Sequence, residues 1–587
     1  MASETESPVS TRKARETLTG YASRAELAVV GVTLFALAVR FVGLGTRIAH
    51  QDEARVAYWA ARYLETGVYE YRPIVHGPFP QIVNGNLFGV LGPSDFTMRL
   101  VVAVLSGLFP LVALLLRDRL RGSEMVALAL LLAVNPVVLY YSRFYRNDVL
   151  LAGFMLTAFA FYVRAYDTRK ARHLYLGTAA FALAFTTKEN ALVYPVCWAG
   201  AAVLLWDHRL LVERAGDRGV LGLLREDIAN RLRGLAHWVP HLALAAVEFL
   251  AIVVFFYAPR NTDRLADNDT PGLYEALGNP LLLPAVVEEA LVGSWDAFAG
   301  QWGSGSEDSY LTMFMDLVPA YVEGASVLLV LALAGFVVDR YADSRPRDVV
   351  AFATYWGAFS ILGYPVIVSN PFPWEVLHAV VPLVVPAAVG LALVARLGLA
   401  SAVDGDAVAA TAAALVLLVV AAQVGATAYA TSFESPQSDD SDLVQYAQSS
   451  SEMKPLLGEM QTVVEANGGI DVLYYGEDLA GEESSHDVPP AGSGWFERLP
   501  FAWYMEAYDA ETDSTDRADL LGNMDEKPPI VIALGETDTC SDPYDSAADI
   551  DQHMDGYDRH EVDRFLHDSG CTVSSVVVYV DEDAPRE

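Results

Sequence analysis

The sequence predicts a polytopic α-helical membrane protein that carries a separate, acidic C-terminal domain. Of its 587 residues, 53% are hydrophobic, and the mean hydropathy of +0.28 is high for a soluble protein of this size. The net charge is nevertheless −35, and residues 431–587 hold 37 of the 74 acidic residues but only 7 of the 39 basic ones. A nearly neutral, apolar body followed by a strongly acidic segment indicates two physical environments in one chain.

The acidic residues are dispersed along the chain, and only 5 of the 39 basic residues are lysines. Dispersed carboxylates repel one another at low salt and are screened at high salt, so this composition favours a halophilic source. The alternative, an acidic patch for a basic partner, requires clustering that the sequence does not have. We expect no nucleic-acid partner.

Apolar runs of roughly 20 residues, the length needed to cross a bilayer, recur through the first 430 residues. After a cytoplasmic N-terminal tail (1–23), they predict a transmembrane domain over 24–430 with about eleven helices. The runs are 24–44, 97–116, 123–140, 148–166, 174–187, 190–206, 238–258, 318–339, 349–368, 376–396 and 407–430.

The basic residues between these runs predict the orientation of the chain. If the N-terminus is cytoplasmic, 21 basic residues lie on the inner side and 9 in the outer loops, in agreement with the positive-inside rule. An odd number of spans then places the acidic domain (431–587) outside the cell. In this orientation the loops 45–96 and 260–317 lie on the outer side, and the loop 207–236 lies on the inner side. The leucines of the inner loop recur at helical spacing, beside arginines that could bind membrane lipids.

The acidic domain has the alternating pattern of a small α/β fold. Apolar β-rich runs at 470–475, 529–534 and 573–580 alternate with helix-like stretches at 442–467, 499–509 and 559–569. Cys540 and Cys571 lie here, where oxidation is permitted, so they form either a disulfide or two separate buried thiols.

Asp52 and Glu53 form a carboxylate pair directly after the first apolar run. Carboxylates at the mouth of a membrane bundle are costly to desolvate, which favours a functional role. One carboxylate can take a proton from an attacking hydroxyl while the other tunes or orients it. We therefore predict both as catalytic residues.

Further charged and aromatic residues occur in the loops on the same side of the membrane. They suit a cavity that binds an anionic headgroup on cations and a sugar on aromatic faces. Three simpler interpretations remain open: Arg143 contacts a lipid phosphate, Arg146 pairs with Asp148, and Lys188 pairs with Glu189. Interfacial aromatic residues also serve as ordinary membrane anchors. The predicted binding residues are Arg55, His76, Arg143, Arg146, Asp148, Lys188, Glu189, Trp374 and His378.

Four segments resemble a known family. They are Asp52-Glu53, the run Asp95-Phe96-Thr97-Met98-Arg99-Leu100, the Arg-x-Asp of Arg146 and Asp148, and the apolar-Thr-Lys-Glu run at 183–189. Over about residues 24–400, their order and topological side resemble the polyprenyl-phosphate-sugar-dependent glycosyltransferases of the GT-C fold, relatives of the dolichyl-phosphate-mannose–protein mannosyltransferases. The whole chain is most similar to haloarchaeal flippase-activity-associated proteins of N-glycosylation.

The resemblance implies a GT-C-like bundle in which Asp52 is the catalytic base and Glu53 its neighbour. It places Arg146, Asp148 and Lys188 near a lipid phosphate. Many relatives carry Lys-Pro-Pro where this chain has His76-Gly77-Pro78, so a lysine that neutralises phosphate is missing. His76, Arg72 or Arg55 is expected to replace that lysine.

The implied function is an inverting hexosyltransferase that uses a polyprenyl-phosphate-linked sugar and a glycan, lipid or protein acceptor. We expect no cofactor and no metal, since nothing beyond the oxygen ligands of Asp52 and Glu53 would fix an ion. The alternative is a non-catalytic protein that handles lipid-linked sugars during N-glycosylation. An ion-coupled transporter is disfavoured because its charges would lie in the middle of the spans, whereas here they lie at loop edges.

Overall fold

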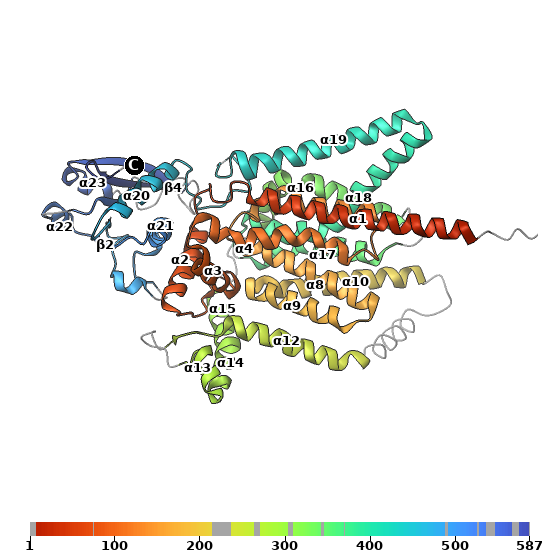
Figure 1. The fold of residues 1–587 in the computed structure, drawn as a ribbon, viewed down its shortest axis with the longest axis horizontal. Helices are drawn as coiled ribbons and strands as arrows, with labels where there is room; N and C mark the ends of the chain where they lie inside the picture. Colours follow the sequence, from red (N-terminus) through yellow and green to blue (C-terminus); the bar gives the residue numbers. More distant parts are fainter. Residues whose placement is uncertain are drawn as a thin grey trace, which may run out of the picture.

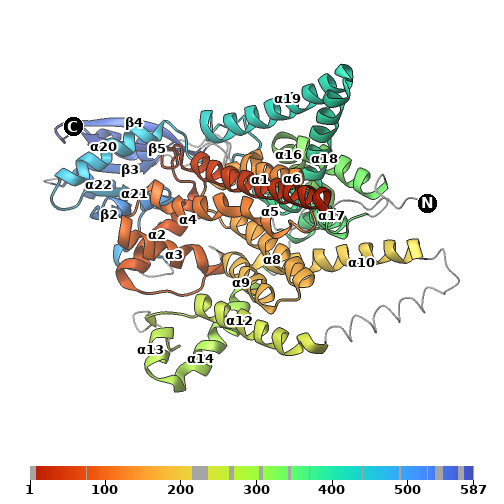
Figure 2. The ribbon, with the colours of Figure 1, turned by 45° about the vertical axis from the view of Figure 1, so that its right-hand side comes forward.

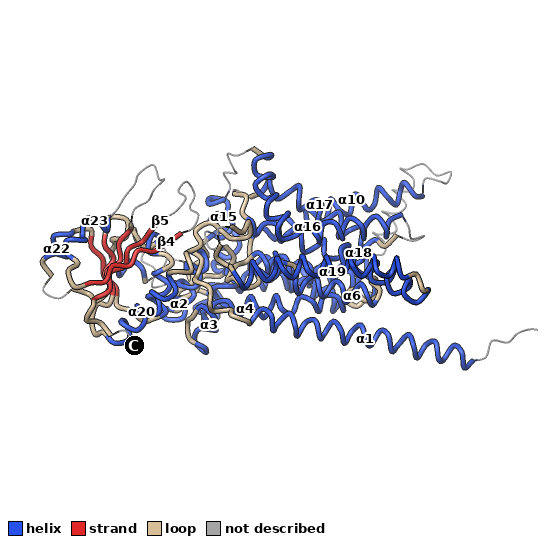
Figure 3. Tube along the Cα trace, turned by 90° about the horizontal axis from the view of Figure 1, so that it is seen from above, coloured by secondary structure: helices blue, strands red, loops and turns tan. Residues whose placement is uncertain are grey.

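The computed structural model describes residues 8–73, 76–213, 236–262, 270–302, 309–341, 346–368, 370–438, 440–487, 491–524, 527–535, 546–565 and 574–585. Long helices run side by side in a bundle, and a small sheet domain lies beyond one end of it (Figure 1). Seen from above, the strands are confined to that end (Figure 3). Two short helices, α2 (Gln51–Thr66) and α3 (Pro78–Leu91), lie between the bundle and the sheet domain.

The bundle confirms a polytopic helical membrane protein. Eight of the described helical segments are long and apolar enough to cross a membrane. The three other predicted spans fall on α1, on α9 and on the pair α6–α7, which is interrupted where Asn135 caps the helix that begins at Pro136. The total of eleven membrane spans stays a prediction. The helices are α1 (Pro8–Phe41), α4 (Asp95–Leu108), α5 (Val112–Leu115), α6 (Gly122–Val134), α7 (Pro136–Tyr141), α8 (Asp148–Thr168), α9 (Ala171–Thr187), α10 (Val193–Glu213), α12 (Val239–Tyr257), α16 (Tyr310–Tyr341), α17 (Asp348–Ile367), α18 (Leu377–Asp404) and α19 (Ala407–Tyr429).

Helix α18 lies at the centre of the bundle, whereas α12 and α19 lie at its edges (Figure 2). Gly335 of α16 and Gly390 of α18 face each other so closely that neither position has room for a Cβ atom. Small residues allow helix backbones to approach in this way, and such contacts are a principal source of helix association in membranes.

Helix α2 has well-defined signals at both ends. The side chain of His50 accepts a hydrogen bond from the Asp52 backbone N–H, and the Glu53 side chain accepts one from the His50 N–H, which together form a capping box. Gly67 ends the helix with φ 68°, a left-handed conformation that glycine adopts without strain. The sequence thus fixes the start of α2 at the predicted carboxylate pair.

The predicted loop at 260–317 contains three further helices: α13 (Leu273–Gly278), α14 (Leu283–Glu288) and α15 (Ser294–Trp302). They lie at the same end of the bundle as α2 (Figure 1). Most of the predicted amphipathic loop at 207–236, and both Cys540 and Cys571, lie outside the described residues.

The C-terminal domain has a five-stranded mixed sheet in the order β2-β1-β3-β5-β4. Its strands are β1 (Val472–Tyr475), β2 (Thr512–Thr515), β3 (Ile530–Leu534), β4 (Tyr557–Phe565) and β5 (Ser574–Asp581). Its helices are α20 (Met453–Ala466), α21 (Phe501–Ala507), α22 (Ala518–Gly522) and α23 (Ser546–Ile550). All three predicted β-rich runs form strands, while the domain boundary at residue 431 stays a prediction.

The prediction of a helix at 559–569 was wrong, because residues 557–565 form the edge strand β4. This strand is rich in charged residues, and its register pairs Arg559 with Tyr579 and Glu561 with Val577 of the buried strand β5. An edge strand pairs on one side only and tolerates charge, so tertiary pairing overrides the local helical tendency.

Candidate active site

A cavity of about 440 Å³ opens between α2, the ends of the bundle helices and the segment that leads into the C-terminal domain. Six of the predicted site residues line it: Asp52, Arg55, His76, Arg146, Lys188 and Trp374. They come from four different parts of the chain. The sequence prediction that these loops meet on one side of the bundle is therefore consistent with the fold.

The Asp52 carboxylate pairs with the Arg146 guanidinium at the wall of this cavity. Arg146 also lies 4.0 Å over the ring of Trp374, and its Nη2 is 3.9 Å from Asp148 Oδ2. Burial alone would raise the pKa of Asp52, but the positive charges of Arg146 and Arg55 outweigh it and hold that pKa below its usual range. Asp52 is therefore an ionised acceptor at neutral pH.

Arg55, one helical turn after Asp52, makes no ion pair with any described residue. Its Nε has no hydrogen-bond partner in the described chain, and its guanidinium lies 4.4 Å over the ring of Phe496. A buried guanidinium with open donors is suited to bind an incoming anion.

A buried cluster of Asp148, Lys188, Glu375 and His378 borders the cavity, with Lys188 and Glu375 in its wall and Asp148 and His378 behind them. Lys188 Nζ donates to Asp148 Oδ1 at 2.7 Å and to Glu375 Oε1 at 3.3 Å. The His378 Nε2 atom lies 3.4 Å from Asp148 and 3.3 Å from Glu375. The structure thus pairs Lys188 with Asp148, rather than with its sequence neighbour Glu189.

Asp148, Glu375 and His378 place one potential ligand atom each within 4.8 Å of one another, a spacing that a metal ion could use. The Lys188 ammonium already contacts both carboxylates and supplies the cation they require. The donor set therefore fits an internal ion-pair cluster better than a metal centre.

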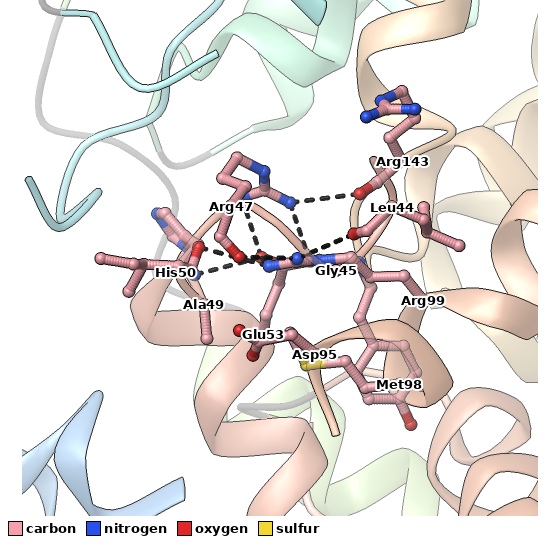
Figure 4. A network of polar contacts seen from close by, with 12 residues as sticks. Leu44, Gly45, Arg47, Ala49, His50, Glu53, Asp95, Met98, Arg99 and Arg143 are labelled. Carbon is pink, nitrogen blue, oxygen red and sulfur yellow. Dashed lines mark hydrogen bonds and ion pairs between the residues drawn. The ribbon is translucent and has the colours of Figure 1, made fainter. Parts of the chain in front are cut away.

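Glu53 does not line the cavity. Its side chain is fully buried on a different face of α2, where it lies between Arg47 and Arg99 (Figure 4). Arg99 donates through Nε and Nη2 at 2.9 and 3.0 Å. Arg47 donates through Nη2 at 3.1 Å, and its Nη1 forms an ion pair with the carboxylate at 2.9 Å. The backbone N–H groups of His50 and Tyr145 complete the shell at 3.1 and 2.6 Å.

This network also gives a structural role to the run from Asp95 to Leu100, the second of the four segments that resemble the family. Arg99, from the run that begins at Asp95, also donates to the carbonyl groups of residues 44, 47 and 48 and so ties α4 to the connection before α2. Asp95 accepts from Lys454 Nζ at 2.8 Å and from the Tyr504 hydroxyl at 3.2 Å. The run therefore joins the bundle, α2 and the C-terminal domain.

Three other predicted residues lie away from Asp52. Arg143 donates to the carbonyl groups of residues 39, 40, 42 and 43 at the end of α1, beside a separate, mostly apolar cavity. His378 is buried in the cluster behind the wall. Glu189 accepts from Tyr71 at 2.6 Å and Tyr257 at 3.2 Å, and it lies 3.7 Å from His76 Nδ1 at the rim.

The cavity also includes residues that sequence reasoning missed. Their only common signal is polarity or aromaticity in loops, which is shared by many residues without a site role. Trp302 stacks on His76 with ring centroids 5.7 Å apart, and Tyr446 accepts from His50 through its carbonyl group. The missed polar and aromatic lining residues are Asn190, Phe298, Gln301, Trp302, Asn370, Phe372, Glu375 and Tyr446, beside the aliphatic Ile367 and Val368.

The cavity lining carries an excess of positive charge. Three basic side chains (Arg55, Arg146 and Lys188) face two carboxylates (Asp52 and Glu375), with His76 as a further donor. Trp302 supplies a flat apolar surface beside them, whereas the two faces of the Trp374 ring are covered by Arg146 and Phe372. This combination suits a ligand with an anionic group and an adjacent ring.

Solved structures share this fold. ArnT from Cupriavidus metallidurans in the apo state aligns over 95% of this chain and 99% of its own, with a TM-score of 0.53 and 16% identity. The same protein bound to undecaprenyl phosphate aligns over 95% and 99%, with a TM-score of 0.51 and 17% identity. The archaeal oligosaccharyltransferase AglB from Archaeoglobus fulgidus covers 86% of this chain and 69% of its own at 13% identity, and its TM-score of 0.47 does not by itself establish a shared fold. The chain is a membrane protein of the GT-C fold.

Two family models make the assignment more particular. Residues 75–223 match the family described as dolichyl-phosphate-mannose-protein mannosyltransferase. Residues 453–581 match the family described as the Agl23 flippase-associated protein C-terminal domain. No curated protein matches the chain. The predicted resemblance to GT-C transferases and to flippase-associated proteins is confirmed, whereas the halophilic source stays a prediction.

Proposed function

We propose that the chain transfers a sugar from a polyprenyl phosphate to an acceptor on the side of the membrane where the C-terminal domain lies, and that this side is extracellular. The observation that carries this proposal is the ionised Asp52 at the wall of a cationic, tryptophan-lined cavity. The match to the mannosyltransferase family and the fold shared with a protein that binds undecaprenyl phosphate support the donor class.

In this proposal the donor phosphate binds first to Arg55, whose guanidinium has no competing carboxylate partner among the described residues. Arg146 and Lys188 add positive charge at the same wall. The sugar ring packs against Trp302, and the prenyl chain extends toward the bilayer. Arg55 takes the role of the lysine that relatives carry before their proline pair.

The reaction is a single displacement with inversion at the anomeric carbon. The acceptor oxygen forms a bond to that carbon while the bond to the phosphate oxygen breaks, and the electron pair leaves with the polyprenyl phosphate. The acceptor proton passes to Asp52. Polyprenyl phosphate is a good leaving group, so cationic stabilisation by Arg55 and Arg146 replaces a general acid.

The pairing of Asp52 with Arg146 makes the carboxylate a weak base when the cavity holds no donor, because Arg146 lowers its pKa. A phosphate that shares the Arg146 guanidinium offsets this positive charge and raises the pKa of Asp52 toward its usual range. Donor binding thereby increases the basicity of Asp52 at the step that requires it.

One observation favours a second candidate function. The C-terminal domain matches the family of a flippase-associated protein, and such a protein would bind lipid-linked sugars without transferring them. It would need Arg55 and Arg146 to bind phosphate but would have no need for a base.

The test is transfer of a radiolabelled sugar from polyprenyl phosphate in membranes at high salt. Asp52→Asn keeps the size of the side chain and removes the base, so we expect transfer to fall by ~10²–10⁴-fold while binding of the lipid phosphate persists. Glu65→Gln, on the exposed side of the same helix, is the matched control and should transfer normally. Absence of transfer by the wild-type protein with every sugar tested, together with normal lipid binding, would favour the flippase-associated role.

A further inference from the structure

A second cavity, of about 270 Å³, lies between α2 and the C-terminal domain, on a part of the helix beyond Asp52. Helix α2 contributes Tyr58 and Arg62, and the C-terminal domain contributes the other walls. The cavity exists only because this domain rests on α2, as the ribbon shows for α2 and α21 (Figure 1). None of the residues assigned to transfer lines it.

Three aromatic side chains, Tyr58, Tyr474 and Trp495, form part of the wall of this second cavity. The rings of Tyr58 and Trp495 have centroids 4.9 Å apart, and Trp59 packs behind Trp495 at 5.2 Å. Tyr474, from strand β1, lies under the Arg498 guanidinium at 4.4 Å. Flat rings beside polar groups provide the apolar faces on which the C–H side of a pyranose packs.

Two buried polar atoms in this wall have no hydrogen-bond partner among the described residues. They are the hydroxyl of Tyr474, a residue that is 1% exposed, and Nε2 of His486, which is 4% exposed. An unsatisfied buried polar group costs about 1–3 kcal/mol, so such groups are rare unless a ligand or water completes them. The Tyr474 hydroxyl can donate or accept, and His486 Nε2 can donate because Nδ1 of the same ring accepts from Arg498 Nη1; both suit the hydroxyl groups of a sugar.

The charges around the second cavity are already paired. Arg498 donates to both carboxylate oxygens of Glu483 at 2.8 and 2.9 Å. Arg62 contacts Asp487 at 2.6 Å and Glu506 at 3.3 Å. With two arginines facing three carboxylates, the lining disfavours an anion, in contrast to the cationic cavity at Asp52.

We propose that this cavity binds one neutral hexose unit of a glycan, separately from the transfer site. Its volume of about 270 Å³ lies just below the ~300–1,000 Å³ range of ligand pockets, so it holds no more than a single ring. The exposed residues Ser484 and Asp487 mark the rim through which a longer glycan would continue into solvent. This site requires no polyprenyl donor and no base.

The test is calorimetric titration of the full-length protein, in detergent at high salt, with methyl hexosides (mannoside, glucoside and galactoside) up to about 50 mM, a range suited to weak binding. Tyr474→Phe removes only the unpartnered hydroxyl. We expect it to weaken binding of the preferred hexoside ~5–10-fold while the melting temperature stays unchanged or rises, since no internal hydrogen bond is lost. Tyr475→Phe, the neighbour in the same strand that packs in a different core cluster, is the matched control and should bind normally.

Further arms separate this proposal from the transfer reaction. Asp52→Asn should bind the hexoside like the wild-type protein, because Asp52 lines the other cavity. Inorganic phosphate should not compete with the hexoside. The proposal is overturned if no hexoside binds, if phosphate competes, or if Tyr474→Phe and Tyr475→Phe have the same affinity as the wild-type protein.

Discussion

Replacing Glu53 by glutamine tests whether the two neighbouring carboxylates have different tasks. The structure surrounds Glu53 with five donated hydrogen bonds and one further ion-pair contact from Arg47, Arg99 and two backbone N–H groups, and gives it no access to the cavity at Asp52. Glu53→Gln keeps the shape of the side chain. It removes the negative charge and turns an amide N–H₂ group toward guanidinium donors.

The expected cost follows from the burial of this cluster. Removing one partner of a buried ion pair costs about 3–5 kcal/mol, because the remaining charge is left uncompensated. Here two buried arginines, Arg47 and Arg99, lose their common carboxylate. Such a loss is a large fraction of the ~5–15 kcal/mol stability that is typical of a folded protein.

The assay is thermal and chemical unfolding of the purified protein in detergent at constant high salt, run in parallel with sugar transfer. We expect Glu53→Gln to unfold markedly earlier than the wild-type protein, whereas Asp52→Asn should lose transfer with a smaller change in stability. Glu65→Gln, on the exposed side of α2, should change stability by less than ~0.5 kcal/mol. Wild-type stability of Glu53→Gln combined with loss of transfer would refute the structural role and make Glu53 a chemical participant.

Two other predictions concern the two cavities. Arg55→Gln removes a guanidinium that has no carboxylate partner among the described residues. In transfer kinetics it should raise the KM for the polyprenyl-phosphate donor ~10–100-fold, with little change in stability. An unchanged KM would contradict phosphate binding at Arg55. Burial raises the pKa of Glu506 to about 7. The negative charges of Glu65 and Asp487 raise it further, while the positive charge of Arg62 lowers it. Because the folded pKa is raised, the stabilising contribution of this group is fully present below the unfolded value near 4.5 and is lost as pH rises through 7. Between pH 5 and 8, the free energy of unfolding of the wild-type protein should therefore fall by about 2–3 kcal/mol relative to that of Glu506→Gln. Unfolding of both proteins across this pH range measures the difference. Parallel pH profiles of the two proteins would contradict the raised pKa.

The sequence predicted the helical bundle well because its signals are strong and local. Runs of roughly 20 apolar residues have few alternatives to a membrane helix. The three β-rich runs of the C-terminal domain are similarly local, whereas strand β4 was missed because its formation depends on β5, which supplies the pairing edge. Strand β2, at the opposite edge, is short and polar and carries no pattern from which it could be predicted.

The roles of Asp52 and Glu53 could not be separated from the sequence alone. Consecutive residues on a helix point about 100° apart, so a carboxylate pair at a helix start faces two different environments. The capping box fixes the rotation of α2, and its members are visible in the sequence only as His50 and Glu53 three positions apart. Which environment each carboxylate meets depends on Arg99 and Arg146, 46 and 94 residues along the chain from their partners.

Helix α2 connects the two cavities physically. Asp52 and Arg55 face the cationic cavity, while Tyr58 and Arg62, three to ten residues further along the helix, face the second cavity. At 1.5 Å per residue, this separation is roughly 5–15 Å along the axis. A glycan of a few units can reach from one cavity to the other. If both proposals hold, the arrangement favours an extended glycan over a simple sugar at the second cavity. The Glu53 network that fixes the start of α2 then sets the spacing between the two sites. Glu53→Gln should therefore weaken the binding of a glycan that spans both cavities more than the binding of a methyl hexoside that occupies one.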